Sequence, residues 1–259
     1  MSKPKLFIAS PCYGGTCYVN YMISLMKARD LLRENGIETK IHFTLTESLI
    51  QRGRNLLVAS FLQSDCTHLL FIDNDLVFNE YDVLKLLKYD KGIVGGIYPK
   101  KNYTWNNFDK ARKRVDEIKN HPINKGISEV DLLKQNLLSY NLNVNKDSTK
   151  IEGNLLEIYT LPTGFMMIKR EVFEKLMKAH PEWEYQDDTG HLDRNGDNRV
   201  YSFFDCGIVD DHYFSEDWFF CKRCIDIGEK IYTDVTINLT HIGYVEYQGR
   251  LLSSLTLTD

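Results

Sequence analysis

The spacing of hydrophobic residues changes repeatedly along the first hundred residues of the chain, and each change predicts a new element. Short apolar or alternating runs predict strands, whereas apolar residues three or four positions apart predict helices. Strands are predicted over 6–10, 38–45, 68–72 and 92–97, and helices over 20–35, 48–63 and 81–88. Strands and helices therefore alternate strictly in this part of the chain.

Strict alternation of strand and helix is typical of an open, mostly parallel, twisted sheet flanked by helices on both faces. The predicted fold class is therefore α/β. Ligands of such sheets bind where the strands reach their carboxyl ends. Asp73 and Asp75 lie at such an end, directly after the strand predicted over 68–72.

Residues 103–150 break this pattern, because they are rich in Lys, Asn and Asp and carry one amphipathic patch at 130–138. They predict a polar insertion: either a helical or partly ordered excursion that covers a substrate site or an oligomer contact, or a solvated connector. Beyond it, strands are predicted over 155–161, 165–168 and 231–239, helices over 171–179 and 215–227, and a polar turn over 193–197. We predict a single domain over 1–259 that carries this insertion.

Composition narrows the function classes. The chain has 259 residues and a net charge of -4, so it lacks the basic excess of a typical nucleic-acid binder. No apolar run approaches the roughly 18 residues of a membrane-spanning helix, and no signal peptide precedes the first strand, so we predict a cytoplasmic protein. The six cysteines include no second CxxC motif, which favours reduced, mostly buried thiols over a zinc site.

Two carboxylates close the third predicted strand, in the sequence Asp73-Asn74-Asp75. Neighbouring carboxylates repel each other and lose hydration unless a cation neutralises them. A divalent ion with oxygen ligands would do so, and such an ion commonly also binds a diphosphate. A solvated turn is the plainer interpretation, because Asp and Asn are ordinary turn residues.

Two further groups of candidate functional residues, here called stations together with the pair Asp73 and Asp75, follow downstream. Glu216 and Asp217 open the helix predicted over 215–227, with Ser215 as its N-cap, and a pair that merely complements the helix dipole is the plainer alternative. His241 follows the strand predicted over 231–239, where its imidazole would supply a ligand to the same ion. A structural histidine is the alternative there.

In this order, the three stations resemble the GT-A fold nucleotide-sugar glycosyltransferases, in particular the family-two-like type of viruses and bacteria. Those enzymes carry a DxD motif, a later ED pair at a helix start, and often a C-terminal histidine that completes the metal shell. Residues 162–168 resemble their acceptor-side strand, and 49–55 resemble the basic helix start that precedes their DxD strand. The resemblance covers most of the chain except 103–150.

The resemblance implies a metal-dependent transferase. Asp73, Asp75 and His241 would hold Mn²⁺ or Mg²⁺, with Asp75 as a direct ligand and Asp73 facing the ribose or the ion through water. The donor would be a nucleotide sugar, with a UDP-sugar as first choice, and the acceptor a hydroxyl of a glycan or another molecule. Asp217 would act as the general base of an inverting displacement, and Glu216 would orient the acceptor or a donor hydroxyl.

The resemblance also implies a nucleotide site near the ends of the first strands. Tyr13 would stack on uracil, and Arg54 would pair with phosphate or carboxylate, or form a salt bridge to Asp73. Lys100 and Lys101 would neutralise phosphate, although a solvated lysine pair is the more frequent arrangement. The candidate nucleotide-binding residues are Pro11, Tyr13, Arg54, Asp73, Asn74 and Lys100.

Two other functions fit part of the pattern. A sugar-phosphate nucleotidyltransferase has a related sheet, but residues 11–16 lack the Arg and Lys expected after its first strand. A non-catalytic nucleotide- or sugar-binding module would not need the intact acids at 73, 75, 216 and 217. The donor sugar, the acceptor, the choice between an inverting and a retaining reaction, and the formation of homo-oligomers are left open. In a viral protein the compartment would be the host cytoplasm.

Overall fold

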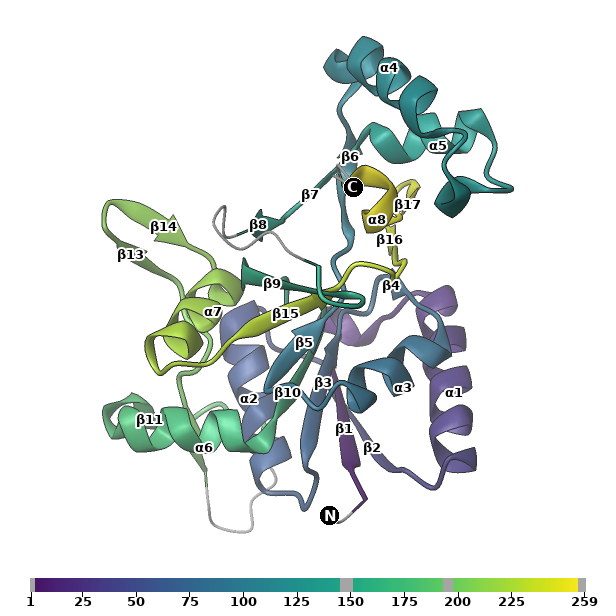
Figure 1. The fold of residues 1–259 in the computed structure, drawn as a ribbon. Coiled ribbons are helices and arrows are strands. Elements are labelled where there is room, and N and C mark those ends of the chain that lie inside the picture. Colours follow the sequence, from purple (N-terminus) through teal and green to yellow (C-terminus); the bar gives the residue numbers. More distant parts are fainter. Residues whose placement is uncertain (1–2, 145–150, 193–197, 256–259) are drawn as a thin grey trace.

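A computed structural model describes residues 3–144, 151–192 and 198–255. At its centre lies an eight-stranded sheet in the order β2-β1-β3-β10-β5-β15-β9-β8 (Figure 1). Its strands are β1 (Lys5–Pro11), β2 (Glu38–Thr44), β3 (His68–Ile72), β5 (Ile93–Gly95), β8 (Asn143–Val144), β9 (Leu155–Thr160), β10 (Phe165–Lys169) and β15 (Ile231–Asp234).

Short strands form four smaller sheets around it. They are β4 (Leu76–Val77), β6 (Pro99–Tyr103), β7 (Leu138–Tyr140), β11 (Glu184–Gln186), β12 (Arg199–Tyr201), β13 (Gly207–Val209), β14 (His212–Phe214), β16 (Thr240–Ile242) and β17 (Glu246–Gln248). The helices are α1 (Val19–Glu34), α2 (Ile50–Leu62), α3 (Glu80–Lys88), α4 (Phe108–Ile118), α5 (Glu129–Asn136), α6 (Arg170–Ala179), α7 (Glu216–Asp226) and α8 (Leu251–Ser254).

The central sheet confirms the predicted α/β class. The strands β2, β1, β3, β5, β15 and β8 run in one direction, and β10 and β9 oppose them. Because β10 runs against β3, its first residue, Phe165, pairs with Ile72 at the carboxyl end of β3. The segment that precedes β10 therefore lies at the same edge of the sheet as Asp73.

Helices cover both faces of the sheet, as predicted, and each face has its own core (Figure 1). Leu69 and Phe71 of β3 pack into a core shared with α2, α6 and α7, whereas Leu70 and Ile72 pack into one shared with α1 and α3. Successive side chains of a strand point to opposite faces, so this buried, continuous apolar strand supplies both cores.

The polar segment that begins at residue 103 contains two α-helices in its described part. α4 packs against α5, and α5 packs against α8. Arg114 of α4 donates from Nη2 to the backbone oxygen of Leu255 at 2.8 Å. Figure 1 shows this group beyond the carboxyl-end edge of the central sheet. The helical alternative therefore describes α4 and α5, while the residues after α5 return to the sheets as β7 and β8.

Several predicted elements differ in extent. The strand predicted over 231–239 ends at Asp234, because Asp234 Oδ1 accepts from the backbone nitrogen of Thr236 at 2.8 Å and turns the chain. The hairpin β13–β14 was not predicted; its turn residues Asp210 and Asp211 both have positive φ, at 50° and 63°. The turn predicted over 193–197 lies outside the described residues.

The structure bears on the predictions for the cysteines and for membrane-spanning helices. All six cysteines are free, which confirms the expected thiols, and the buried ones are Cys12, Cys66, Cys221 and Cys224. Within the described ranges, no helix combines the length and apolar character needed to cross a membrane.

Gly95 supports the close passage of β10, and its replacement generates a stability prediction. A β-carbon at this position would lie 2.1 Å from the backbone oxygen of Phe165 and 3.0 Å from Leu161 Cδ2. We expect Gly95→Ala to lower the free energy of unfolding by roughly 1–3 kcal/mol or more, measured by urea denaturation. The matched control is Gly53→Ala inside α2, where the nearest neighbour, Glu47 Cγ, is at 3.4 Å. That change should stabilise by about 0.5–1 kcal/mol, and similar losses at both sites would contradict the prediction.

Candidate functional site

A two-residue strand brings the acidic turn and the late histidine together. The chain leaves β3 through residues 73–75 and enters β4, which pairs with β16. In this register His241 lies opposite Leu76, and the backbone nitrogen of Ile242 donates to the backbone oxygen of Asp75 at 2.8 Å. The pairing of β4 with β16 therefore fixes the imidazole beside the second carboxylate of the turn.

Asp75 is in contact with an imidazole and an ammonium group. Its Oδ2 lies 3.5 Å from Nε2 of His241, and the ammonium of Lys101 contacts the same oxygen. His241 Nδ1 lies 2.8 Å from the backbone oxygen of Pro99; because a carbonyl can only accept, Nδ1 carries a proton. Burial by itself would raise the pKa of Asp75, but the contacts with His241 and Lys101 lower it, so the carboxylate is ionised at neutral pH.

Arg54 joins the acidic turn to the acidic start of α7. Its Nη2 donates to Asp73 Oδ1 at 3.1 Å, and its Nε donates to Glu216 Oε1 at 3.4 Å. The Arg54 side chain is 4% exposed. Burial by itself would lower the pKa of Arg54, but the charges of Asp73 and Glu216 raise it, so the guanidinium remains a cation. Of the partners predicted for Arg54, the carboxylate of Asp73 is the one observed.

The neighbours of Arg54 fix α2 in place. Asn55 exchanges two hydrogen bonds with the backbone of Phe204, at 2.8 and 2.9 Å. Phe204 lies upstream of the hairpin that leads into α7. Arg52 donates from Nη2 to the buried Glu47 at 2.9 Å. The sequence Arg-Gly-Arg-Asn at 52–55 thus ties α2 to its own start, to the acidic turn and to the approach to α7.

Gly164 lies against both Asp73 and Tyr98. Its backbone oxygen accepts from the backbone nitrogen of Asp73 at 2.9 Å. A β-carbon on Gly164 would lie 2.5 Å from the Tyr98 hydroxyl and 2.6 Å from Asp73 Oδ2, so both groups converge over the glycine. Burial, followed by the charge of Asp73, raises the pKa of Tyr98 well above its usual value, which keeps the hydroxyl a proton donor.

Tyr98 was not among the predicted site residues. A signal for it exists in the sequence, because it follows the short strand β5 at the carboxyl end, where ligand-binding residues of such sheets gather.

Asp217 lies in the first turn of α7, and one of its carboxylate oxygens, Oδ1, is already hydrogen-bonded. Its Oδ1 accepts from the Ser215 hydroxyl and, at 2.8 Å, from the backbone nitrogen of Trp218. Among the described residues, no hydrogen bond to its second oxygen, Oδ2, is found. Ser215 stands at the N-cap position as predicted, but its side chain bonds Asp217 rather than the helix backbone.

The predicted nucleotide-binding residues lie in different surroundings. Pro11 ends β1, and the ring of Tyr13 in the following loop is 67% exposed. Asn74 donates from Nδ2 to the backbone oxygen of Thr16 at 2.8 Å, which ties that loop to the acidic turn. Lys100 is exposed on β6, while the next residue, Lys101, is the one that reaches Asp75.

The three predicted metal ligands do not share one cluster. Within residues 3–144, 151–192 and 198–255, no group of three or more His, Cys, Asp or Glu side chains is arranged to hold a metal ion. Asp73 faces Arg54, whereas Asp75 and His241 face each other. An imidazole whose Nδ1 donates to a backbone carbonyl has the second-sphere contact usual for metal-ligating histidines. Of the three predicted ligands, Asp75 and His241 are therefore the two that lie side by side.

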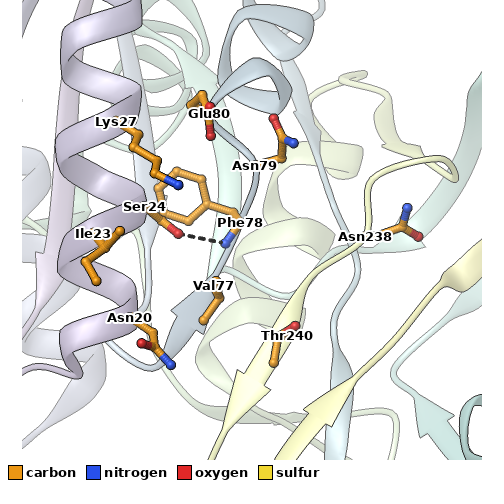
Figure 2. A pocket seen from close by; sticks show the side chains of 10 residues that line it. All are labelled: Asn20, Ile23, Ser24, Lys27, Val77, Phe78, Asn79, Glu80, Asn238 and Thr240. Carbon is orange, nitrogen blue, oxygen red and sulfur yellow. Dashed lines mark hydrogen bonds between the residues drawn. The ribbon is translucent and has the colours of Figure 1, made fainter. Parts of the chain in front are cut away.

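A separate pocket lies between α1 and the pair β4–β16 (Figure 2). Its volume is about 350 Å³, and Val77 and Thr240 form one wall while Asn20 and Lys27 of α1 form another. Neither Asp75 nor His241 lines it. The strands that position the candidate site are therefore open to solvent on their α1 side as well.

No protein-family model matches the chain, and no curated protein matches it. Among solved structures, that of GalNAc-T7 with UDP, GalNAc and Mn²⁺ matches with a TM-score of 0.42 and 8% sequence identity. The match covers 93% of this chain and 44% of that one, so this chain spans less than half of that protein. A likeness of this degree assigns no activity.

The charge arrangement around Arg54 generates a prediction of stability. Removal of the guanidinium leaves Asp73 and Glu216 without their shared cation, and the loss of one partner of a buried ion pair costs about 3–5 kcal/mol. We expect Arg54→Met to lower the free energy of unfolding by this amount in urea denaturation at pH 7. The control is Arg33→Met, because Arg33 is 75% exposed and lies 3.5 Å from Asp30. A loss of under about 1 kcal/mol, as expected for the control, would contradict the structural role of Arg54.

Proposed function

We propose that this chain is a metal-dependent glycosyltransferase that moves a sugar from a nucleotide sugar, with a UDP-sugar as first choice, to an acceptor hydroxyl. The observation that supports it most is the guanidinium of Arg54, which joins Asp73 of the DxD turn to Glu216 of the acidic helix start. Beside it, Asp75 and His241 face each other at the carboxyl end of the sheet. Residues from distant parts of the chain thus meet where α/β sheets bind nucleotides.

Asp75 and His241 are the residues proposed to hold a divalent ion. A carboxylate with an imidazole suits Mn²⁺, and Mg²⁺ is commonly held by one or two carboxylates together with phosphate oxygens. Such an ion, when bound, supplies Lewis-acid stabilisation of a departing diphosphate. Asp73 is engaged by Arg54 through Oδ1, so we assign its Oδ2 to the ribose or to the ion through water.

The nucleotide base and phosphates are proposed to lie over the loop that follows β1. The exposed ring of Tyr13 offers a stacking surface for uracil, and Asn74 fixes this loop against the acidic turn. Lys100 remains a proposed phosphate-binding residue from the outer side of β6. Arg54 contributes indirectly, since its charge is shared by two carboxylates and positions Asp73.

Asp217 is the proposed general base. The Ser215 hydroxyl and the Trp218 backbone nitrogen orient the carboxylate through Oδ1, and Oδ2 is left to accept the proton of the attacking hydroxyl. Glu216, held by Arg54, is proposed to orient the acceptor or a hydroxyl of the donor sugar. Direct attack by a hydroxyl activated in this way inverts the anomeric carbon.

Binding of UDP tests the donor site and the ion together. We expect UDP to raise the melting temperature only when Mn²⁺ is present, because the ion neutralises the diphosphate next to Asp75. At UDP concentrations near 100 times the dissociation constant, the added stability should be about 2.7 kcal/mol. Asp75→Asn should abolish the shift, while Asp30→Asn on the exposed face of α1 should retain it. Equal shifts in EDTA and in Mn²⁺ would remove the metal from the proposal.

The role of Asp217 is tested by the rate of sugar release. We expect Asp217→Asn to keep the UDP affinity of the wild type but to slow transfer, or hydrolysis of the donor by water, by roughly 10²–10⁴-fold. Asparagine keeps the acceptor oxygen for Ser215 and Trp218 but takes up no proton. Asp226→Asn, at the other end of α7 and paired with Lys222, is the control and should leave the rate unchanged. Wild-type rates in Asp217→Asn would exclude this residue as the base.

A further inference from the structure

Lys101 occupies the place where the proposed function requires a cation. Its ammonium contacts Asp75 Oδ2, the same oxygen that lies 3.5 Å from His241 Nε2. His241 Nδ1 donates to Pro99, so Nε2 is the ring nitrogen that faces Asp75. One ammonium therefore neutralises the carboxylate that, with the imidazole, is proposed to bind a divalent ion.

The reach of Lys101 is set by its packing. A β-carbon on Gly243 would lie 3.1 Å from Lys101 Cδ and 3.7 Å from Lys101 Cγ, so the aliphatic stem lies against the backbone beyond β16. The side chain is 36% exposed, while Asp75 is 19% exposed and His241 is 15% exposed. The stem thus packs against Gly243 at Cγ and Cδ, and the ammonium lies at the border between solvent and the site.

Lys100 provides an internal comparison. It is the neighbouring residue on β6, is exposed, and has no ion pair among the described residues. Successive side chains of a strand point to opposite sides, so only one of two consecutive lysines can reach Asp75. The two residues have the same chemistry and nearly the same sequence position, and they differ in their contact with the carboxylate.

We propose that Lys101 is a resident counter-cation of Asp75 that excludes a divalent ion from the empty site and leaves Asp75 when a nucleotide diphosphate enters with the ion. This inference rests on the proposed function. An ammonium in contact with one carboxylate oxygen and a divalent ion on the same carboxylate repel each other. A diphosphate removes the conflict, because its oxygens bind both the ion and the displaced ammonium. Metal and nucleotide therefore bind with positive cooperativity.

In this proposal, Lys101 has opposite effects on the affinities of the two ligands. Lys101 weakens the binding of the ion alone, because it competes with it, and strengthens the binding of the nucleotide, because it becomes a phosphate ligand. Linkage requires that the ion and the nucleotide raise each other's affinity by the same factor. Loss of the ammonium should therefore tighten the first binding event and weaken the second, an effect that a merely structural salt bridge does not produce.

The test compares the wild type with Lys101→Met and with the matched control Lys100→Met. Mn²⁺ is titrated into each protein without nucleotide and followed by electron paramagnetic resonance of the free ion. UDP is then titrated at saturating Mn²⁺ and followed by calorimetry. We expect Lys101→Met to bind Mn²⁺ alone about tenfold tighter and UDP about tenfold weaker, within the range usual for coupled sites. Lys100→Met should match the wild type in the Mn²⁺ titration.

The outcomes separate this inference from the proposed function. Unchanged Mn²⁺ affinity in a folded Lys101→Met protein, with UDP binding still dependent on Mn²⁺, overturns the inference and leaves the proposed function in place. UDP binding that ignores Mn²⁺ in all proteins overturns both. If Lys101→Met fails to fold, Lys101→Gln replaces it, because glutamine keeps part of the stem and a polar end without the charge. Equal effects of Lys100→Met and Lys101→Met on the affinity for Mn²⁺ alone also overturn the inference.

Discussion

The site depends on one buried cation. The guanidinium of Arg54 is almost fully removed from water and lies over the ring of Phe71, 5.4 Å from its centroid. A charge in this position is tolerated because two carboxylates face it, and they in turn are held apart at a fixed spacing by the planar guanidinium. Since residues 53–59 of α2 are buried throughout, Arg54 cannot shift without the helix. The packing of the core around α2 thus sets the distance between the acidic turn and the start of α7.

Two features of topology bring the remaining groups to this cation. The reversed direction of β10 places Gly164 against Asp73, where a side chain would displace both Asp73 and Tyr98. The small sheet of β4, β16 and β17 then carries His241 to Asp75. Neither feature belongs to the regular alternation of strand and helix. The regular part of the fold provides the edge, and the irregular parts supply the groups that meet there.

The sequence predicted the first part of the fold well, because strands such as β3 are buried on both faces and read as continuous apolar runs. It also placed Asp73 and Asp75 directly after β3, whereas His241, which was expected after a strand, lies inside β16. It did not reveal that β4 and β16 pair, since strands of two and three residues leave no periodicity. It did not decide between Lys100 and Lys101, because a register shift of one residue exchanges their faces. The sequence did not predict the turn of β13–β14, because Asp210-Asp211 stands where a hairpin usually has Asn-Gly.

The pairing of β4 with β16 also sets the order in which the molecule can mature. Translation delivers the chain from its N-terminus, and segments fold as they emerge. A nascent chain that has emerged as far as α3 already contains β1, β2, β3 and both acids of the turn, but no imidazole opposite Leu76. Asp75 therefore lacks its imidazole neighbour until the chain has been synthesised through β16. The site is complete only after β16 has emerged and paired with β4.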